Sequence, residues 1–252
     1  MRALRAEDIE KFSTILCDMD GVVWREGEVI WENVEGLRRL KNRGKKLIFI
    51  TNNSSKKWTD YAKRLEILGI EADVIITSST ATANYLINMG IKRVYAIGEE
   101  GLFWALESVG IKLCDEKPEA VVVGIDRNFN YEKLKRASNF VYFGTFFVAT
   151  NLDAHIREGN GILPGAGSIV SAISYASGRK PDVVIGKPNR YMFEGLDLKD
   201  GVLIGDNLET DILGGKNVGI PTILVLTGVH NLDDVEKLGI EPDFFAENLL
   251  TV

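Results

Sequence analysis

Continuous apolar runs alternate along the chain with segments of helical periodicity. The apolar runs predict strands buried on both faces at residues 13–18, 46–51, 72–77, 93–98, 120–125, 146–150, 182–186, 201–205 and 221–226. Segments typical of helices lie at residues 33–43, 55–68, 79–89, 131–139, 167–177 and 209–218. Short strands that alternate with helices predict an α/β protein, with a parallel sheet covered by helices on both faces.

Glycine marks the ends of helix-like segments. An apolar residue, glycine and isoleucine follow one another at residues 68–70, 89–91, 109–111, 218–220 and 238–240. Glycine just past a helix end adopts the left-handed cap conformation, and the apolar residue after it folds back onto the last turn. A predicted strand follows each of the first four of these patterns along the chain, and a weaker apolar run at 242–246 follows the last.

Composition narrows the classes of protein and of partner. The 252 residues, 45% of them hydrophobic, can form one large α/β domain or two smaller ones. A net charge of −6 argues against nucleic-acid and membrane-surface partners, and no apolar stretch approaches the roughly 18 residues of a membrane span. Cys17 and Cys114 match no metal-ligand or disulfide pattern, so we expect a reducing compartment, the cytoplasm.

Two aspartates, Asp18 and Asp20, come directly after the first predicted strand, within the stretch ILCDMDG. Extended chain has a period of two, so both carboxylates point to the same side at the strand end. Like charges that close require a cation or a hydrogen-bond network to stay ionised. The alternative is an ordinary polar turn, since Asp and Gly both favour turns.

Three further strand ends carry polar residues. They are TNNSS at 51–55, where hydroxyl and amide groups meet a helix start, Lys187 after 182–186, and DNLETD at 206–211. Each has a plain alternative: helix capping, a solvated surface lysine, and acidic residues stabilised at a helix N-terminus. Ligands of open α/β sheets bind at the carboxyl ends of strands. Together these residues form a set suited to phosphoryl transfer, and hard oxygen ligands favour Mg²⁺ over zinc.

At this point the motifs resemble those of the haloacid dehalogenase (HAD) superfamily of phosphatases. The shared pattern is DxDG, a strand ending in Thr or Ser, a lysine, and GDxxxTD, in that order. The resemblance implies that Asp18 is a nucleophile that becomes an aspartyl-phosphate. It implies that Asp20 protonates the leaving oxygen and then activates water. Dehalogenases of the superfamily lack the second acid, so we expect a phosphatase.

The resemblance also implies the ligands of metal and phosphate. Phosphate would be held by Thr51, Asn52, Asn53 and Lys187, and Lys187 also counts among the catalytic residues. Mg²⁺ would be bound by Asp18, the main-chain carbonyl of Asp20, and Asp206. Asp211 and Asn207 would not bind the metal themselves but would orient the residues that do.

The long segment between the second and third motifs resembles an inserted α/β cap. The expected fold is a Rossmann-like HAD core with a parallel sheet at 1–78 and 182–252, and a smaller α/β cap at 79–181. The sequences TNNSS, ATNLD (149–153), LPGAGS (163–168), SGRKP (177–181) and GKPNRYMFE (186–194) resemble the branch of NagD, p-nitrophenylphosphatase and phosphoglycolate phosphatase. Residues 165–168 are interpreted as a turn and helix cap.

Cap residues of such enzymes face the leaving group, so the candidates for substrate selection are Thr150, Asn151, Asp153 and His155. The alternative for His155 is an exposed loop histidine. The expected substrate is a small phosphate ester; Asn207 leans towards a nucleoside monophosphate. A sugar, polyol or pyridoxal phosphate, or phosphoglycolate, stays open, as do a phosphotransferase and a non-catalytic binding scaffold. The aromatic residues between 140 and 147 are assigned to cap core or to a homodimer interface through the cap.

Overall fold

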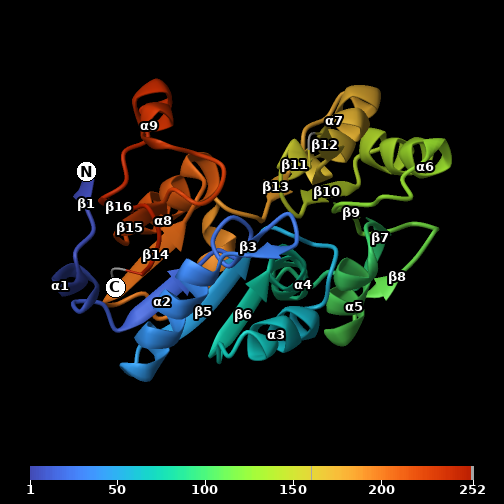
Figure 1. The fold of residues 1–252 in the computed structure, drawn as a ribbon. Coiled ribbons are helices and arrows are strands. Elements are labelled where there is room, and N and C mark those ends of the chain that lie inside the picture. Colours follow the sequence, from blue (N-terminus) through green and yellow to red (C-terminus); the bar gives the residue numbers. More distant parts are fainter. Residues whose placement is uncertain (160, 251–252) are drawn as a thin grey trace. The chain divides into compact units, whose positions relative to one another are not determined.

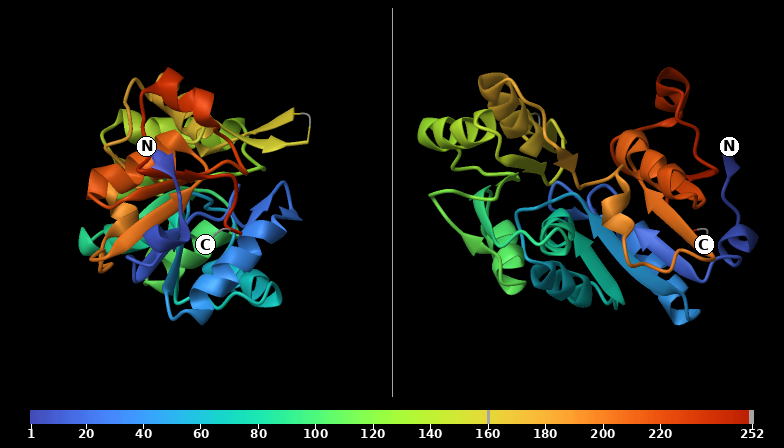
Figure 2. Two further views of the ribbon diagram at one scale, coloured as in Figure 1. Left: turned by 60° about the vertical axis from the view of Figure 1, so that its left-hand side comes forward. Right: turned by 180° about the vertical axis from the view of Figure 1, so that it is seen from behind.

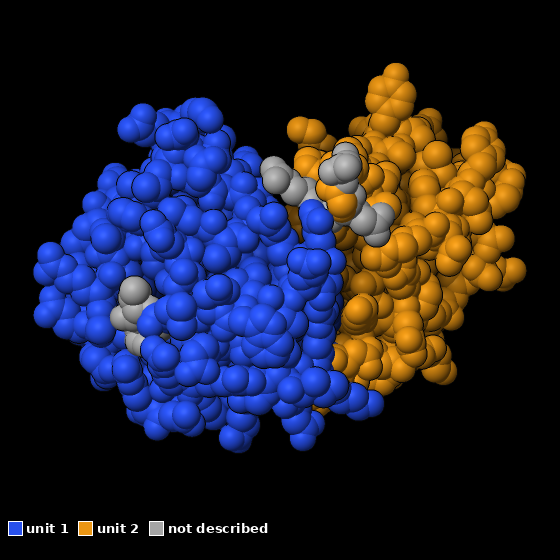
Figure 3. Space-filling model, in the orientation of Figure 1, with its two compact units in different colours: residues 1–51, 61–76, 187–252 blue, residues 52–60, 77–186 orange. Residues whose placement is uncertain are grey.

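The computed structural model describes residues 1–159 and 161–250. The chain divides into two compact units, shown in different colours in Figure 3. Unit 1 comprises residues 1–51, 61–76 and 187–252, and unit 2 comprises residues 52–60 and 77–186. The assignment of one unit as a core and the other as a cap stays a prediction.

A seven-stranded sheet forms the centre of unit 1, with the strand order β1-β16-β15-β14-β2-β5-β6 (Figure 1). All neighbouring pairs from β1 to β5 are parallel. The strands are β1 (Arg2–Ala3), β2 (Thr14–Cys17), β5 (Lys46–Thr51), β6 (Val74–Thr77), β14 (Gly201–Gly205), β15 (Thr222–Val225) and β16 (Phe244–Ala246). The predicted α/β fold with a parallel sheet is confirmed.

Helices cover both faces of this sheet. Successive side chains of β15 point to opposite faces and pack against different helices. Ile223 and Val225 pack in one apolar cluster with residues of α2 (Trp31–Asn42) and α3 (Trp58–Ile67). Leu224, between them, packs in another cluster with η2 (Leu208–Ile212) and α9 (Leu232–Leu238). The remaining helices of the unit are α1 (Ala6–Ile9), η1 (Arg190–Phe193) and α8 (Leu213–Val218). Strands buried on both faces explain the continuous apolar runs.

Unit 2 has its own five-stranded parallel sheet, with the order β13-β10-β9-β7-β8. Its strands are β7 (Arg93–Ile97), β8 (Lys112–Leu113), β9 (Ala120–Val123), β10 (Phe146–Ala149) and β13 (Val183–Val184). Its helices are α4 (Ser78–Asn88), α5 (Glu100–Ser108), α6 (Tyr131–Tyr142) and α7 (Ala166–Ser177). Each unit therefore buries a core of its own.

Two antiparallel hairpins were not predicted. One pairs β3 (Trp24–Arg25) with β4 (Glu28–Val29) in unit 1. The other pairs β11 (His155–Glu158) with β12 (Gly161–Pro164) and projects from unit 2; it is drawn in yellow at the right edge of the left view in Figure 2. Strands this short show too little alternation to be recognised from the sequence.

The predicted helix ends agree with the structure. Gly69, Gly90, Gly110, Gly219 and Gly239 all have positive φ, between 66° and 84°. The interpretation of residues 165–168 is also confirmed, because Gly165 is the N-cap of α7. The predicted helix at 55–68 begins later, at Trp58.

The aromatic residues between 140 and 147 divide between core and surface of unit 2. Phe147 is buried, and Phe140 packs against the same cluster. Tyr142 and Phe143 are 65% and 81% exposed. A homodimer interface at these exposed rings stays a prediction. Among the described residues, no helix is long and apolar enough to cross a membrane.

Candidate active site

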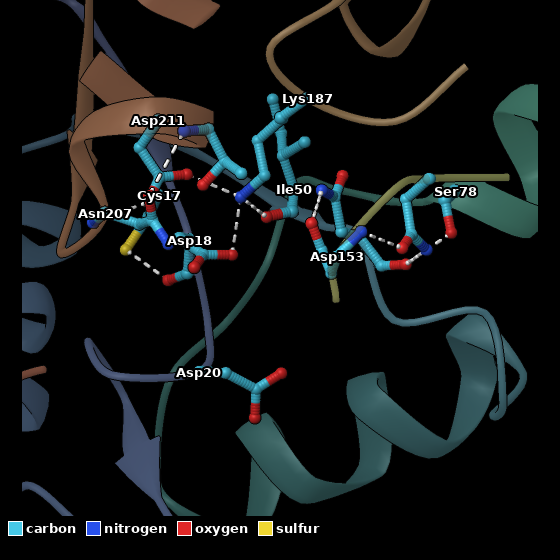
Figure 4. Close-up of polar contacts among 12 residues, drawn as sticks. Cys17, Asp18, Asp20, Ile50, Ser78, Asp153, Lys187, Asn207 and Asp211 are labelled. Atoms are coloured by element: carbon cyan, nitrogen blue, oxygen red, sulfur yellow. Dashed lines mark hydrogen bonds and ion pairs between the residues drawn. The ribbon is translucent and has the colours of Figure 1, made fainter. Parts of the chain in front are cut away.

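Asp18 follows β2 and is buried at the carboxyl end of the unit 1 sheet. Its N–H group donates to Ile204 O of β14 at 2.9 Å, which extends the strand pairing by one residue. The residue is only 8% exposed. Its carboxylate oxygen Oδ1 accepts a hydrogen bond from Lys187 Nζ at 2.7 Å (Figure 4). A carboxylate at this depth requires such a cationic partner.

Lys187 is 3% exposed, and its ammonium group donates to three oxygen atoms of unit 1. Besides Asp18, its Nζ donates to Asp211 Oδ1 at 2.6 Å and to Ile50 O at 3.2 Å. An ammonium group has three donors, so these three contacts fix its position. The solvated-surface alternative for Lys187 is wrong.

Asp206 and Asp211 complete a buried acidic cluster with Asp18. One carboxylate oxygen of each lies within 4.8 Å of the others. Asp206 Oδ2 accepts from Val229 N at 2.7 Å. Asp211 Oδ2 accepts from Asn207 N at 3.1 Å, and the Asn207 side chain caps η2 by accepting from two backbone N–H groups. Asp206 directly follows β14, and each carboxylate oxygen of Asp211 accepts a hydrogen bond, one from Lys187 and one from Asn207.

Glycine makes room for Asp206. A Cβ atom at Gly21 or at Gly228 would fall well inside the van der Waals radius of Asp206 Oδ2. Gly21 also has a φ of 82°, in the left-handed region. The backbone at both positions can therefore approach the carboxylate only because neither residue has a side chain.

The charges in this cluster do not balance, since three buried carboxylates face one buried ammonium group. Burial raises the pKa of Asp18 well above its ordinary value, against the lowering effect of Lys187. Burial and the Asp211 charge raise the pKa of Asp206 to about 7. Burial alone would lower the pKa of Lys187, but Asp18 and Asp211 raise it above its ordinary value.

This donor set fits a hard divalent cation. It consists of carboxylate oxygens in a buried site with an excess of negative charge, and no Cys or His belongs to the cluster. Mg²⁺ prefers oxygen ligands of this kind. Both Asp211 oxygens already accept hydrogen bonds from the protein, which leaves Asp18 and Asp206 as the better candidates for direct ligands.

Asp20 has a different environment, although one residue separates it from Asp18. Its side chain is exposed, and it lies apart from the cluster in Figure 4. Its Oδ1 accepts a hydrogen bond from the indole nitrogen of Trp24 at 2.9 Å. The two aspartates are therefore not equivalent, which agrees with different roles for each.

The other predicted site residues lie at the end of β5 and in unit 2. Thr51 is buried as the last residue of β5. In unit 2, Asn52 Nδ2 donates to Asp153 Oδ1 at 3.2 Å, and the main-chain oxygen of Asn52 accepts from Asn151 Nδ2 at 2.8 Å. Asn52, Asn151 and Asp153 thus form one polar group, of which Asp153 is labelled in Figure 4.

Thr150 belongs to the same group, because its hydroxyl oxygen accepts from Asn151 Nδ2 at 3.3 Å, whereas Asn53 and His155 have contacts of other kinds. Asn53 Oδ1 accepts from the N–H and hydroxyl groups of Ser55, as a capping residue does. Thr150 is fully buried. His155 is exposed and begins the β11 strand, where it pairs with Pro164.

Sequence reasoning missed a further polar strand end. After β15, the Thr227 hydroxyl donates to Gly21 O at 2.7 Å, and Val229 N holds Asp206. The stretch TGVH at 227–230 follows the predicted strand at 221–226. The same rule that identified the other strand ends applies to it and would have found it.

Comparisons with known proteins agree with this geometry. A family model described as "Haloacid dehalogenase-like hydrolase" matches residues 15–112, and a HAD-hydrolase-like model matches residues 184–252. The ribonucleotide monophosphatase NagD of Escherichia coli K12 is 35% identical, over 94% of this chain and 97% of its own length. The 5′-nucleotidase YutF of Bacillus subtilis is 38% identical, over 91% and 94%. The crystal structure of a 4-nitrophenylphosphatase from Thermotoga maritima has a TM-score of 0.90 and 35% identity, over 96% of this chain and 97% of that one.

Proposed function

Because the chain belongs to the haloacid dehalogenase-like hydrolases, in the branch of NagD-type phosphatases, we propose that it is a Mg²⁺-dependent phosphomonoesterase that works through an aspartyl-phosphate. The observation that supports this most is the buried pair of Asp18 and Lys187 beside Asp206 and Asp211. It places a carboxylate next to fixed positive charge, at the carboxyl end of a parallel sheet.

The first step is attack by an oxygen of Asp18 on phosphorus. The bond from phosphorus to the ester oxygen breaks, and the leaving oxygen takes a proton from the Asp20 carboxyl group. In the second step, Asp20 takes a proton from water, and that water attacks the phosphorus. The bond from phosphorus to Asp18 then breaks and releases inorganic phosphate. Asp18 needs a fixed position for this, whereas Asp20 must exchange protons, so a buried and an exposed aspartate suit these roles.

By the resemblance to the family, phosphate would be held by Lys187, Thr51, Asn52 and Asn53. The Lys187 ammonium group already donates to Asp18, Asp211 and Ile50, so it would act on the phosphate as a positive charge held in a fixed position. Asp18, Asp206 and the main-chain carbonyl of Asp20 would hold Mg²⁺. Asp211 and Asn207 would orient these ligands without binding the metal. When bound, the metal neutralises charge on the cluster and on the phosphate oxygens.

We propose a nucleoside monophosphate as the substrate, with Asn151, Asp153 and His155 selecting the leaving group. The names of NagD and YutF support this choice. Phosphoglycolate phosphatases, acid sugar phosphatases and a glycerol-3-phosphate phosphatase are 34–36% identical to this chain. Their substrates therefore belong in the same assay. We place the reaction in the cytoplasm, which agrees with the two unpaired cysteines.

The test is phosphate release from nucleoside monophosphates, phosphoglycolate, sugar and glycerol phosphates, pyridoxal phosphate and p-nitrophenyl phosphate. Each is assayed with Mg²⁺ and with chelator, for the wild type, Asp18→Asn and Asp233→Asn. Asp233 is an exposed aspartate on α9 and serves as the matched control. We expect release that needs both Mg²⁺ and Asp18, and that Asp233→Asn retains. A folded, Mg²⁺-loaded wild type that releases phosphate from none of these esters would refute the proposal.

A further inference from the structure

The turn after Asp18 folds the chain back so that Trp24 meets Asp20. The N–H groups of residues 22–24 all point to Met19 O, at 2.8–3.3 Å, and Gly21 N donates to Trp24 O at 2.7 Å. Asp20 and Trp24 also form an isolated β-bridge. The indole nitrogen of Trp24 then donates to Asp20 Oδ1 at 2.9 Å. The backbone of the turn thus brings the indole to the acid.

The indole ring of Trp24 has little freedom to move. Trp24 is 2% exposed, although the Asp20 side chain that it contacts is exposed. The Tyr61 ring of α3 stacks parallel to it, with ring centroids 6.3 Å apart and planes 8° apart. The Arg64 guanidinium carbon of α3 lies 4.0 Å from the ring centroid. Helix α3 therefore fixes the position of the N–H group.

A fixed indole N–H group makes the two oxygens of Asp20 chemically different. Indole nitrogen only donates a hydrogen bond and does not titrate in the physiological range. The terminal torsion of an aspartate is broad, so without a partner the carboxyl group would rotate between many orientations. An oxygen that accepts from the indole cannot carry a proton in the same direction. In a carboxylic acid the unprotonated oxygen is the better acceptor, so the indole hydrogen bond to Oδ1 favours the transferable proton on the other oxygen, Oδ2.

We propose that Trp24 is a positioning residue that holds Asp20 Oδ1 and so presents Oδ2 as the oxygen that exchanges protons. This inference rests on the proposed function. During attack by Asp18 on phosphorus, the Oδ2–H bond breaks, and its proton goes to the leaving oxygen as the ester bond breaks. In the second step Oδ2 takes the proton of the attacking water. Oδ1 keeps the Trp24 hydrogen bond throughout.

The kinetic test uses esters that differ in their need for a proton. Trp24→Phe keeps an aromatic ring for Tyr61 and Arg64 but removes the N–H donor. The value of kcat/KM covers only the steps up to the departure of the leaving group. For an alkyl phosphate we expect it to fall about 10- to 100-fold, within the range of general acid catalysis. For p-nitrophenyl phosphate the loss should be clearly smaller, because p-nitrophenolate leaves without a proton. Trp31→Phe is the matched control, since Trp31 is an exposed tryptophan of the same unit.

An equal loss of kcat/KM on both esters would mean that Trp24 has only a structural role. No loss on either ester would mean that the Trp24–Asp20 hydrogen bond does not contribute to catalysis. Each result overturns the inference. If Trp24→Phe folds poorly, the test uses benzothiophenylalanine at position 24 instead. This residue keeps the ring shape of tryptophan but has sulfur in place of the N–H group, and we expect the same difference between the two esters.

A measurement without turnover separates this inference from the proposed function. The indole ¹H–¹⁵N resonance of Trp24, identified by its loss in Trp24→Phe, should shift upfield in Asp20→Ala, while that of Trp31 stays in place. An unchanged Trp24 resonance would overturn the inference even in an active enzyme. A wild type inert on every ester would instead refute the proposed function, and with it the role of Oδ2.

Discussion

Replacing Lys187 by methionine should destabilise unit 1 strongly, because it removes the ammonium group and keeps the volume. Lys187 donates to Asp18 at 2.7 Å, Asp211 at 2.6 Å and Ile50 O at 3.2 Å. The variant leaves two buried carboxylates and a carbonyl without this donor. Removing one partner of a buried ion pair costs about 3–5 kcal/mol. The loss should grow with pH, since at low pH the carboxyl groups take up protons instead of staying charged.

The assay is urea unfolding of wild type and Lys187→Met at pH 5 and pH 8, with chelator present. Lys45→Met is a matched control, because Lys45 is also buried, at 9% exposure, and its Nζ donates to Glu10 O at 2.9 Å. Its carboxylate partner, Glu10, is half exposed. Its ion pair with Glu10 should contribute about 0–1 kcal/mol. A Lys187→Met loss no larger than that of Lys45→Met, or equal at both pH values, would refute the charge-compensation argument.

Two further predictions concern Asp206. Its pKa near 7 lies above its ordinary value of 3.8, so its neutral form contributes stability that is full below pH ~4 and is lost as pH rises through 7. In protein freed of metal by chelator, the free energy of unfolding should fall by ~4 kcal/mol over this range, at 1.36 kcal/mol per pKa unit. Thermal melts from pH 4 to 8 should show this fall, and Asp206→Asn should make stability depend less on pH. Gly228→Ala places a Cβ against Asp206 Oδ2, so Mg²⁺ affinity measured by calorimetry should fall at least about tenfold. In Gly214→Ala the new Cβ meets its nearest neighbour at 3.5 Å, and Mg²⁺ affinity should not change; equal affinities in the two variants would contradict the crowding argument.

Much of the fold could be predicted because its signals are local. Strands such as β5, buried at all but its first residue, appear in the sequence as unbroken apolar runs. The glycines after helix ends, such as Gly69 and Gly219, follow from a backbone conformation that few other residues adopt. Parallel strands then align their carboxyl ends, so polar residues after Cys17 and Gly205 could be expected to meet. The structure brings Asp18, Asp206 and Asp211 together there.

What could not be predicted depends on contacts between distant segments. The position of Lys187 after a strand and in the motif order indicated a role for it, but not its contacts: Asp18 and Asp211, to which its ammonium group donates, are 169 and 24 residues away. The β3–β4 hairpin is only two residues long on each side. Trp24 looks like a core residue in the sequence, and only the turn at residues 19–24 reveals its contact with Asp20.

The separation of Asp18 from Asp20 follows from where the strand ends. Up to Cys17, β2 is paired on both sides, and the Asp18 N–H group still donates to Ile204 O of β14. Beyond that the chain turns back at Gly21, whose positive φ also lets the backbone approach Asp206. Asp18 therefore stays with the sheet and its lysine, while Asp20 leaves the sheet and meets Trp24. One turn in a stretch of seven residues thus gives two nearby carboxylates different environments, as the proposed roles of nucleophile and proton carrier require.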